Sequence, residues 1–477
     1  MQINRLIFPG FWFDKNTWQQ GEELARAGVG GFCLYGGTGA QIKEFCARVR
    51  RASPWEKILI CADYEDGLGR WVKDSVRLAP NMALGAADST ELSFEKGFLT
   101  ARAARALGVD WVFAPVADLA DTPDNPIVNT RAFSAHPQAV IRLAGALMKG
   151  LTQGGALNCL KHFPGHGQTQ VDSHLALPVL SRTPEELFQA ELKPFAALLP
   201  LADGVMTGHL KVPALDAREP ASLSAAITTG LLKEKLGWKG CVLTDALLMR
   251  AIGDECHAAR EALNAGAHIL LAMNDPHKVS RFLHIKNPPA PALLRAAHAQ
   301  LDALCARSNR ATPVVPPTHA ELEDFNRRTA RAACVWDGAF RLQAGERVRA
   351  VVLGDDEQTG WAVLREKLTQ SGIQLTDGPA DKVLIISLAN YKSFKGRIRL
   401  TPQDESRALQ AARQARQSAL VCLGSPFAAL PLKGAVNAVL QAFCPLPAFQ
   451  QEAAALLLGH HAAQGKKIGR ASCRERV

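Results

Sequence analysis

Eight short apolar runs, separated by amphipathic stretches, occupy roughly the first 275 residues of this chain. The stretches between the runs carry apolar residues at spacings of three and four, which is typical of helices. Eight strands that alternate with helices over this length favour a (β/α)8 barrel over an open, doubly wound sheet. The predicted strands cover residues 6–13, 30–35, 58–63, 111–116, 157–162, 204–210, 241–245 and 268–273.

Polar or ionisable residues stand at the end of run after run. In a barrel of parallel strands, all the carboxyl ends open on one face, where the loops that follow the strands carry the catalytic groups. We therefore expect these side chains to gather at one mouth. They are Asp63, Glu65, Asp118, Lys161, His162, His209, Asp245 and Asn274.

A second set of apolar runs begins after a polar, proline-containing segment. We predict strands at 347–353, 382–388, 418–423 and 435–443, with a helix at 404–416. The predicted fold is therefore α/β: a barrel over 1–307, a linker over 308–330, and a smaller α/β domain over 331–467. Residues 468–477, IGRASCRERV, look like translated adapter DNA, so we expect the natural C-terminus to be missing and the second domain to be truncated.

The overall composition excludes several classes of function. The net charge is +10, but Lys and Arg are scattered without a run of five like charges, so we expect no nucleic-acid partner. The sequence contains no apolar segment of membrane-spanning length and no recognisable signal peptide, which predicts a cytoplasmic enzyme without a membrane partner. Eleven cysteines occur without a CxxC pair, so we expect buried, reduced thiols.

The most informative segment, KHFPGHGQTQVDSH, leaves the fifth predicted strand at Lys161 and ends at His174. Its glycines, Gly165 and Gly167, permit a positive φ and let the loop take an unusual shape. A carboxylate two residues before a histidine, as Asp172 is before His174, can orient the imidazole and raise its basicity. Such a pair suits proton transfer near neutral pH.

The same segment leaves a metal site open as an alternative. Its three histidines, His162, His166 and His174, and the carboxylate of Asp172 are all residue types that bind zinc. The spacing does not decide between a metal site and a proton-transfer pair. We favour proton transfer and expect no metal.

Two further strand ends carry carboxylates. Asp245 closes the apolar run GCVLTD and stands just before a turn, where an aspartate can also serve as a helix N-cap. A carboxylate facing a proton donor across a barrel mouth is what double-displacement glycoside hydrolysis requires. The segment CADYEDGLGR places Asp63, Glu65 and Arg70 on a glycine-rich turn that could hold sugar hydroxyls or simply be solvated. It contains no GxxxxGK[ST] phosphate-binding pattern.

Four segments, KHFPGHG followed by DSH, CVLTDALLM, ADYEDG and NTRAFS, together resemble glycoside hydrolase family 3. The resemblance is to the two-domain type of its bacterial β-N-acetylglucosaminidase branch. It implies a retaining mechanism without a cofactor, with Asp245 as nucleophile and His174, paired with Asp172, as acid/base. The substrate-binding residues that it implies are Asp63, Arg70, Arg131, Lys161 and His162.

The resemblance also implies a substrate: terminal β-linked N-acetylglucosamine (more broadly, N-acetylhexosamine) in muropeptides or chitin-derived oligosaccharides, as in peptidoglycan recycling. A β-glucosidase and a β-N-acetylglucosaminide phosphorylase are the alternatives on the same scaffold. A catalytically silent sugar-binding barrel would not need Asp245, Asp172 and His174 together. The chain departs from the family pattern DxEGGR, because Asp66 replaces a glycine, Leu68 stands where the pattern has its arginine, and Arg70 follows two residues further on.

Overall fold

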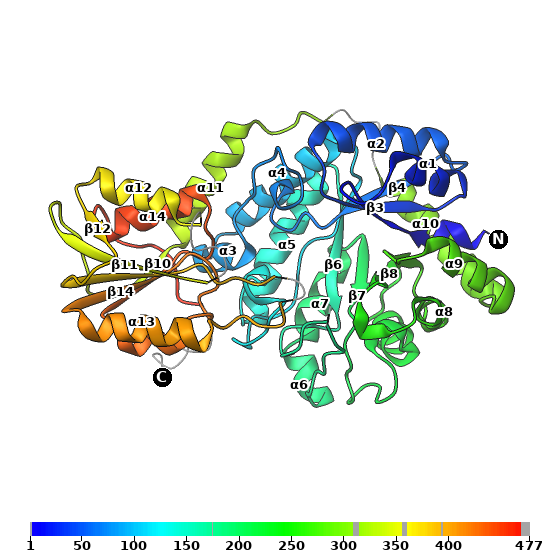
Figure 1. The fold of residues 1–477 in the computed structure, drawn as a ribbon. Helices are drawn as coiled ribbons and strands as arrows, with labels where there is room; N and C mark the ends of the chain where they lie inside the picture. Colours follow the sequence, from blue (N-terminus) through cyan, green and yellow to red (C-terminus); the bar gives the residue numbers. More distant parts are fainter. Residues whose placement is uncertain (1, 174, 309–313, 355–359, 393–394, 469–477) are drawn as a thin grey trace.

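The first domain is a closed barrel of parallel strands (Figure 1). The computed structural model describes residues 2–173, 175–308, 314–354, 360–392 and 395–468. The first predicted strand is split into two pieces, of which β1 pairs with β9 and β2 pairs with β3, so the sheet closes on itself. This confirms the predicted (β/α)8 barrel. The strands are β1 (Ile7–Phe8), β2 (Gly10–Trp12), β3 (Gly31–Tyr35), β4 (Leu59–Ala62), β5 (Trp111–Val112), β6 (Leu157–Phe163), β7 (Gly204–Thr207), β8 (Cys241–Ala246) and β9 (Ile269–Leu271).

Helices surround the barrel on its outside (Figure 1). Several begin at a capping box, in which a threonine and a Glu or Gln three residues later satisfy each other's backbone amides; Thr17, Thr38 and Thr183 do this for α1, α2 and α6. The helices are α1 (Trp18–Arg26), α2 (Gly39–Ala52), α3 (Asn81–Ala87), α4 (Thr90–Ala106), α5 (Pro137–Gln153), α6 (Pro184–Gln189), α7 (Leu192–Leu198), α8 (Glu255–Ala265), α9 (Pro276–Arg281) and α10 (Pro291–Arg307), and a π-helical segment (Ala226–Lys235) lies between β7 and β8.

The barrel interior is filled by side chains that point inward from the strands. Aromatic and sulfur-containing residues dominate it, among them Trp111, Phe113, Cys61 and Cys159. All ten cysteines in the described part of the chain are buried, as expected; the eleventh, Cys473, lies outside it. The packed interior means that only the loops at the barrel's ends can form a binding site.

The second domain is a smaller α/β unit with a six-stranded sheet. Its strand order is β10-β15-β14-β13-β11-β12, and all neighbours are parallel except β10 and β15. The four predicted strands are present, together with two short edge strands, β10 and β12, that we did not predict. The strands are β10 (Val335–Gly338), β11 (Arg347–Leu353), β12 (Gln374–Thr376), β13 (Lys382–Ser387), β14 (Gln417–Cys422) and β15 (Ala438–Gln441), and the helices are α11 (His319–Ala333), α12 (Ala362–Gln370), α13 (Pro402–Gln414) and α14 (Pro447–Leu457).

The two domains lie side by side, with α11 running from one to the other (Figure 1). From His319 onward the predicted linker is helical, because Thr318 caps α11 and Glu321 completes the capping box. On α11, Asn326 accepts a hydrogen bond from the amide of Ala79 and donates one to the carbonyl of Arg77. The start of the second domain is thus joined to the barrel segment that follows β4.

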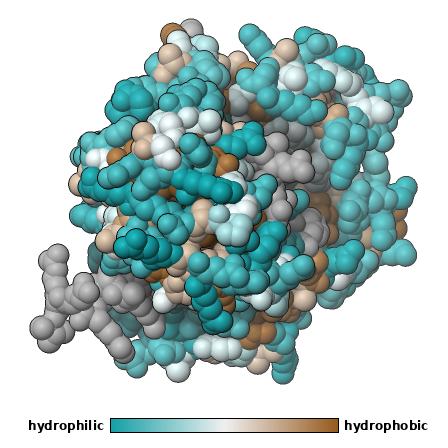
Figure 2. Space-filling model, turned by 60° about the vertical axis from the view of Figure 1, so that its left-hand side comes forward, coloured by the Kyte–Doolittle hydropathy of each residue, from teal (hydrophilic) through white to brown (hydrophobic). Residues whose placement is uncertain are grey.

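The face of the molecule in Figure 2 is covered mainly by hydrophilic residues, with hydrophobic residues in small scattered groups. Such a face is ordinary for a globular protein. Within the described residues, no helix is both long enough and apolar enough to cross a membrane.

Candidate active site

A cavity of about 210 Å³ opens at the carboxyl ends of the barrel strands. This volume is small beside the roughly 300–1,000 Å³ of pockets that take drug-sized ligands, and it suits one compact polar molecule such as a sugar ring. Its lining combines charged groups, aromatic rings and apolar side chains. The lining residues are Trp12, Tyr35, Asp63, Glu65, Arg70, Trp71, Ile127, Arg131, Lys161, His162, His166, Ser173, Met206, Asp245, Ala246, Leu248, Met249, Leu271 and Tyr391.

Most of the site residues expected from the sequence meet in this cavity. Asp172 is buried and does not line it, although its neighbour Ser173 does. His174 lies outside the described residues. The six expected residues that line the cavity are Asp63, Arg70, Arg131, Lys161, His162 and Asp245.

Three of the eight polar strand-end residues do not line the cavity: Asp118, which instead bonds to His162, and His209 and Asn274. His209 is buried beneath it, where its Nε2 donates to the carbonyl of Ala246 at 3.0 Å and its Nδ1 accepts from the hydroxyl of Ser222 at 2.7 Å. Asn274 is exposed, and its backbone amide bonds to Glu255. The expectation that all strand-end polar groups meet at one mouth is therefore wrong for His209 and Asn274, because a residue just beyond a strand can turn under or away from the mouth.

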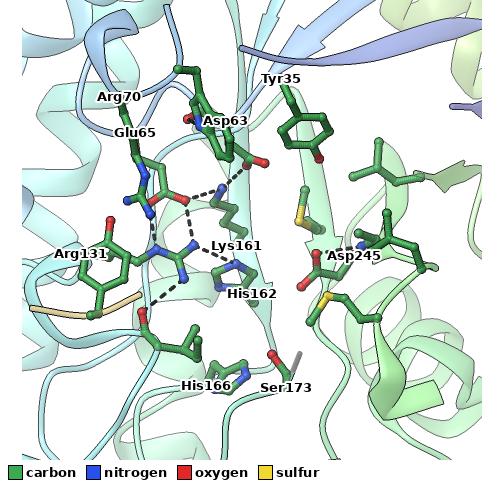
Figure 3. Close-up of a pocket in the computed structure, with 18 of the residues that line it drawn as sticks. Tyr35, Asp63, Glu65, Arg70, Arg131, Lys161, His162, His166, Ser173 and Asp245 are labelled. Atoms are coloured by element: carbon green, nitrogen blue, oxygen red, sulfur yellow. Dashed lines mark hydrogen bonds and ion pairs between the residues drawn. The ribbon is translucent and has the colours of Figure 1, made fainter. Parts of the chain in front are cut away.

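One wall of the cavity is a chain of alternating charges (Figure 3). The Lys161 ammonium lies 2.6 Å from carboxylate oxygens of both Asp63 and Glu65. Glu65 also binds Arg131 through two parallel hydrogen bonds, with Nε to Oε2 at 2.8 Å and Nη2 to Oε1, the oxygen that Lys161 contacts, at 2.7 Å. A bidentate pair of this kind holds both groups in one orientation. The wall therefore presents preorganised donors and acceptors to a ligand.

Burial and ion pairing act in opposite directions on this wall. Burial by itself would raise the pKa of Glu65, but the charges of Arg131 and Lys161 outweigh it and hold that pKa well below its ordinary value. Burial likewise opposes the charged form of Lys161, yet Asp63 and Glu65 raise the pKa of the ammonium. Glu65 and Lys161 are therefore charged at neutral pH, and removing either one would leave an unpaired buried charge.

The hydrogen bonds of His162 determine its tautomer. The guanidinium of Arg131 can only donate, and it lies 3.3 Å from Nε2 of His162. Nε2 is therefore the acceptor, and the proton is on Nδ1, which donates to Asp118 at 2.7 Å. Asp118 also accepts the backbone amide of His166 at 2.7 Å. Both ring nitrogens of His162 thus have partners within the protein.

Two β-bulges in the sheet determine which side chains point into the cavity. Between Lys161 and Phe163, β6 has one residue more than its partner β7, and between Leu243 and Ala246, β8 has one more than β9. Consecutive residues of a regular strand point to opposite faces, and a bulge changes this alternation. Lys161 and His162 both line the cavity, as do Asp245 and Ala246. The bulges thus account for paired site residues on single strands.

The glycines of the loop after β6 are needed for two different reasons. Gly165 has a φ of +126°, as expected. Gly167 does not have a positive φ, so that expectation is wrong; a Cβ atom there would instead lie 2.0 Å from the carbonyl oxygen of Leu119. Asn125 holds the same stretch by donating to the carbonyls of His166 and Gly167. The loop is therefore closely packed against the segment that follows β5.

Two buried histidines, His166 and His268, are expected to make the stability of the fold depend on pH. Burial lowers the pKa of His166 to about 4 and the pKa of His268 to about 3. Between these values and the unfolded pKa of about 6.5, only the unfolded chain binds the protons, so the free energy of unfolding falls as pH falls. We expect urea denaturation to show a loss of about 2 kcal/mol per histidine from pH 7 to pH 5.

The test compares one buried and one exposed histidine. His268→Gln should reduce this dependence on pH, whereas His277→Gln, at an exposed position, should leave it unchanged. An identical dependence in all three proteins would contradict the assignment.

Asp245 lies across the cavity from the charged wall (Figure 3). Its Oδ1 accepts the amide of Ala246 at 2.7 Å. The strand order places β8 four positions from β4 around the closed barrel, which is the opposite side. The cavity lining near Asp245 is apolar and comes from β7, the turn after β8, and β9; it consists of Met206, Leu248, Met249 and Leu271.

Several lining residues were absent from the expected set. Glu65 was expected at the barrel mouth but not as a substrate-binding residue, and it lines the cavity together with His166 of the loop after β6. An aromatic cluster is new: Tyr35 stacks on Trp12 with ring centroids 4.7 Å apart and meets Trp71 edge-on at 5.1 Å. Among the described residues, no three His, Cys, Asp or Glu side chains are grouped as a metal site requires.

Comparisons with known proteins agree with this geometry. Residues 2–301 match the N-terminal domain of glycosyl hydrolase family 3. A protein named beta-hexosaminidase from Nitrosomonas eutropha is 34% identical over 277 residues, which are 55% of this chain and 78% of that protein. A beta-hexosaminidase from Pseudomonas aeruginosa is 34% identical over 270 residues, which are 54% of this chain and 80% of that protein.

Solved structures with both domains share the fold. A family 3 β-N-acetylglucosaminidase from Paenibacillus superposes with a TM-score of 0.86 at 24% identity, covering 98% of each chain. The β-glucoside phosphorylase BglX, bound to 2FGlc, superposes with a TM-score of 0.90 at 21% identity, covering 98% of this chain and 93% of the other. With its barrel, its charged wall and the family match over the whole first domain, this chain belongs to glycosyl hydrolase family 3 and is a glycoside hydrolase.

Proposed function

We propose that this enzyme is a retaining β-N-acetylhexosaminidase that removes terminal, non-reducing β-linked N-acetylglucosamine. Asp245 is the nucleophile, and His174, assisted by Asp172, is the acid/base. The charged wall of Asp63, Lys161 and Arg131 binds the sugar hydroxyls, together with Arg70 and His162. Curated relatives named beta-hexosaminidase support this substrate class.

The observation that carries the proposal is the contrast between the two sides of the cavity. A nucleophile attacks the anomeric carbon, C1, so C2 and its substituent lie close to Asp245 as well. The lining there is apolar, with Met206 and Leu248 among its members. An acetamido group places a methyl group in such surroundings, whereas the hydroxyl of glucose would be buried there without a partner. This side therefore favours the N-acetylated sugar.

The chemistry follows from the two groups. The carboxylate of Asp245 attacks C1 while His174 protonates the departing oxygen, which forms a glycosyl ester and releases the aglycone. His174, now neutral, then takes a proton from water, which attacks C1 and frees Asp245. Two inversions give overall retention. The charged wall holds the hydroxyls throughout and keeps the ring in position for attack.

Phosphorolysis is the second candidate. A neutral histidine, unlike a second carboxylate, does not repel an anionic acceptor at C1, so phosphate could replace water in the second step. A β-glucoside phosphorylase has a similar fold, so the same scaffold can carry out phosphorolysis. Muropeptides and chitin-derived oligosaccharides are the natural substrates that we propose under either reaction.

The deciding experiment compares two chromogenic substrates. The 4-nitrophenyl β-N-acetylglucosaminide should be turned over with a much higher kcat/KM than the 4-nitrophenyl β-glucoside, and a chelator should have no effect. The sugar product is identified with and without phosphate: free N-acetylglucosamine indicates hydrolysis and the sugar 1-phosphate indicates phosphorolysis. Turnover of the glucoside alone would overturn the proposed substrate.

The bidentate pair of Arg131 and Glu65 predicts a further effect. Arg131→Lys keeps the charge but loses the two parallel hydrogen bonds, so the wall is no longer held in one geometry. We expect kcat/KM to fall by roughly a hundredfold. Arg142→Lys, at a surface ion pair with Asp88, is the matched control and should have wild-type activity. Wild-type kinetics in Arg131→Lys would show that the pair does not position the substrate.

A further inference from the structure

Lys96 is a buried lysine that the proposed reaction does not use. It lies within α4, and its side chain is only 1% exposed. A buried ammonium group is costly unless it is paired and hydrogen-bonded. Its Nζ lies 3.5 Å from Oδ1 of Asp66 and donates to Oδ1 of Asn81 at 2.7 Å. Lys96 is thus joined to two segments that lead to the charged wall, although it does not line the cavity itself.

The first of these segments carries Glu65 and Arg70. Asp66 follows Glu65 directly, and its buried carboxylate also binds Arg77 at 2.9 Å. Burial lowers the pKa of Arg70, and the charges of Asp66 and Glu65 oppose this effect. Arg70 lines the cavity but Asp66 does not, so an unbalanced carboxylate at Asp66 would attract the Arg70 guanidinium away from a ligand. Burial alone would raise the pKa of Asp66, but the cations Lys96 and Arg77 balance its charge and lower that pKa.

The second segment carries Arg131. Asn81, at the start of α3, donates through Nδ2 to the carbonyl of Arg131 at 2.7 Å, while its Oδ1 accepts from Lys96. Asn81 is buried, so water does not compete for these bonds. Its amide therefore fixes the backbone of Arg131, whose guanidinium binds Glu65. The pair of Arg131 and Glu65 is supported from outside the cavity at both residues, and the two supports meet at Lys96.

Asp66 stands where the family pattern has a glycine. A glycine brings no charge to this position, whereas the carboxylate of Asp66 brings a buried negative charge that must be balanced. The ammonium of Lys96 balances it from α4. The departure from the family pattern and the buried lysine are therefore two parts of one arrangement.

We propose that Lys96 is a positioning residue for the sugar-binding wall: through Asp66 it leaves Arg70 available to the substrate, and through Asn81 it fixes Arg131. The proposal rests on the proposed function for the role of the wall in binding the sugar. Lys96 acts without touching the substrate, so its replacement should weaken binding while the groups that react at C1 stay in place.

The test measures KM and kcat for three variants. Lys96→Met keeps the length of the side chain and removes its charge, Lys96→Met combined with Asp66→Asn removes both charges, and Lys149→Met, at an exposed position on α5, is the matched control. On the 4-nitrophenyl β-N-acetylglucosaminide we expect Lys96→Met to raise KM roughly tenfold, with kcat within about threefold of wild type. The double variant should bring KM back to within about threefold of wild type, because no unbalanced carboxylate is left to attract Arg70. Lys149→Met should have wild-type kinetics.

The value of KM separates positioning from stability. A purely structural loss lowers the fraction of folded enzyme, and with it the apparent kcat, but leaves KM unchanged. An unchanged KM in Lys96→Met, or a KM in the double variant as high as in the single variant, would overturn the proposal.

Asn81→Ala keeps the test decisive if Lys96→Met does not fold, because it removes the support of Arg131 without removing a charge. A KM raised several-fold supports the proposal, and a wild-type KM overturns it. If the wild-type enzyme acts only on the β-glucoside, the proposed substrate fails, and the same variants measured on that glucoside still decide the role of Lys96.

Discussion

Asp245→Asn should lower kcat/KM by about four orders of magnitude, as removal of a covalent nucleophile does in other enzymes. The amide is neutral and cannot form the glycosyl ester. The fold should be preserved, because Asp245 is only partly buried and an asparagine side chain can still accept the amide hydrogen of Ala246 through its oxygen. Steady-state kinetics and Tm measure the two effects.

A matched control and a direct test accompany this prediction. Asp254→Asn, at the exposed N-cap of α8 in the segment after β8, should keep full activity. Wild-type enzyme treated with a 5-fluoro glycosyl fluoride of N-acetylglucosamine should gain the mass of one sugar on the peptide that contains Asp245. A label on another residue, or an active Asp245→Asn enzyme, would show that Asp245 is not the nucleophile.

His174→Ala should lose about two to four orders of magnitude in kcat/KM on natural-type substrates, whose departing alkoxide needs a proton. The loss should be much smaller with a 2,4-dinitrophenyl glycoside, because that group leaves without protonation. Added azide should speed the second step, since it attacks C1 without needing a general base. The dependence of rate on leaving-group pKa is the measurement.

Asp172→Asn tests the assisting role in the same assay. The buried carboxylate precedes His174 by two residues, and its removal should reproduce the leaving-group dependence in a weaker form. Gln170→Ala, an exposed position in the same loop, is the control and should be fully active. Losses that are equal for all leaving groups would assign these residues a structural role in place of proton transfer.

The fold of the barrel could be predicted because the hydrophobic pattern of each strand and helix lies within a short segment of the sequence. Each of the eight apolar runs holds a strand, and alternating apolar and amphipathic segments are enough to identify parallel strands with helices outside them. The place of Asp63, Lys161 and Asp245 followed from the same pattern, since parallel strands open at one end. The edge strands β10 and β12 were missed because short strands at a sheet edge carry little hydrophobic pattern.

The pairing within the site could not be predicted in the same way. The motif around Lys161 drew attention to its histidines, yet nothing in it indicated that Asp118 would hold His162 or that Glu65 would bind Arg131 and Lys161 together. Asp66, which replaces a glycine of the family pattern, turns away from the cavity and pairs with Arg77 at 2.9 Å. Arg70 nevertheless lines the cavity, so the altered spacing does not remove it.

The sequence by itself determined the barrel, the second α/β domain, and the mouth at which Asp63, Lys161 and Asp245 meet, because hydrophobic periodicity and the direction of parallel strands are properties of short segments. Only the tertiary structure decided which ring nitrogen of His162 carries the proton, which side chains of the bulged strands face the cavity, and that Tyr391 of the second domain lines it. These depend on distances between side chains far apart along the chain, and no local pattern of residues encodes such distances.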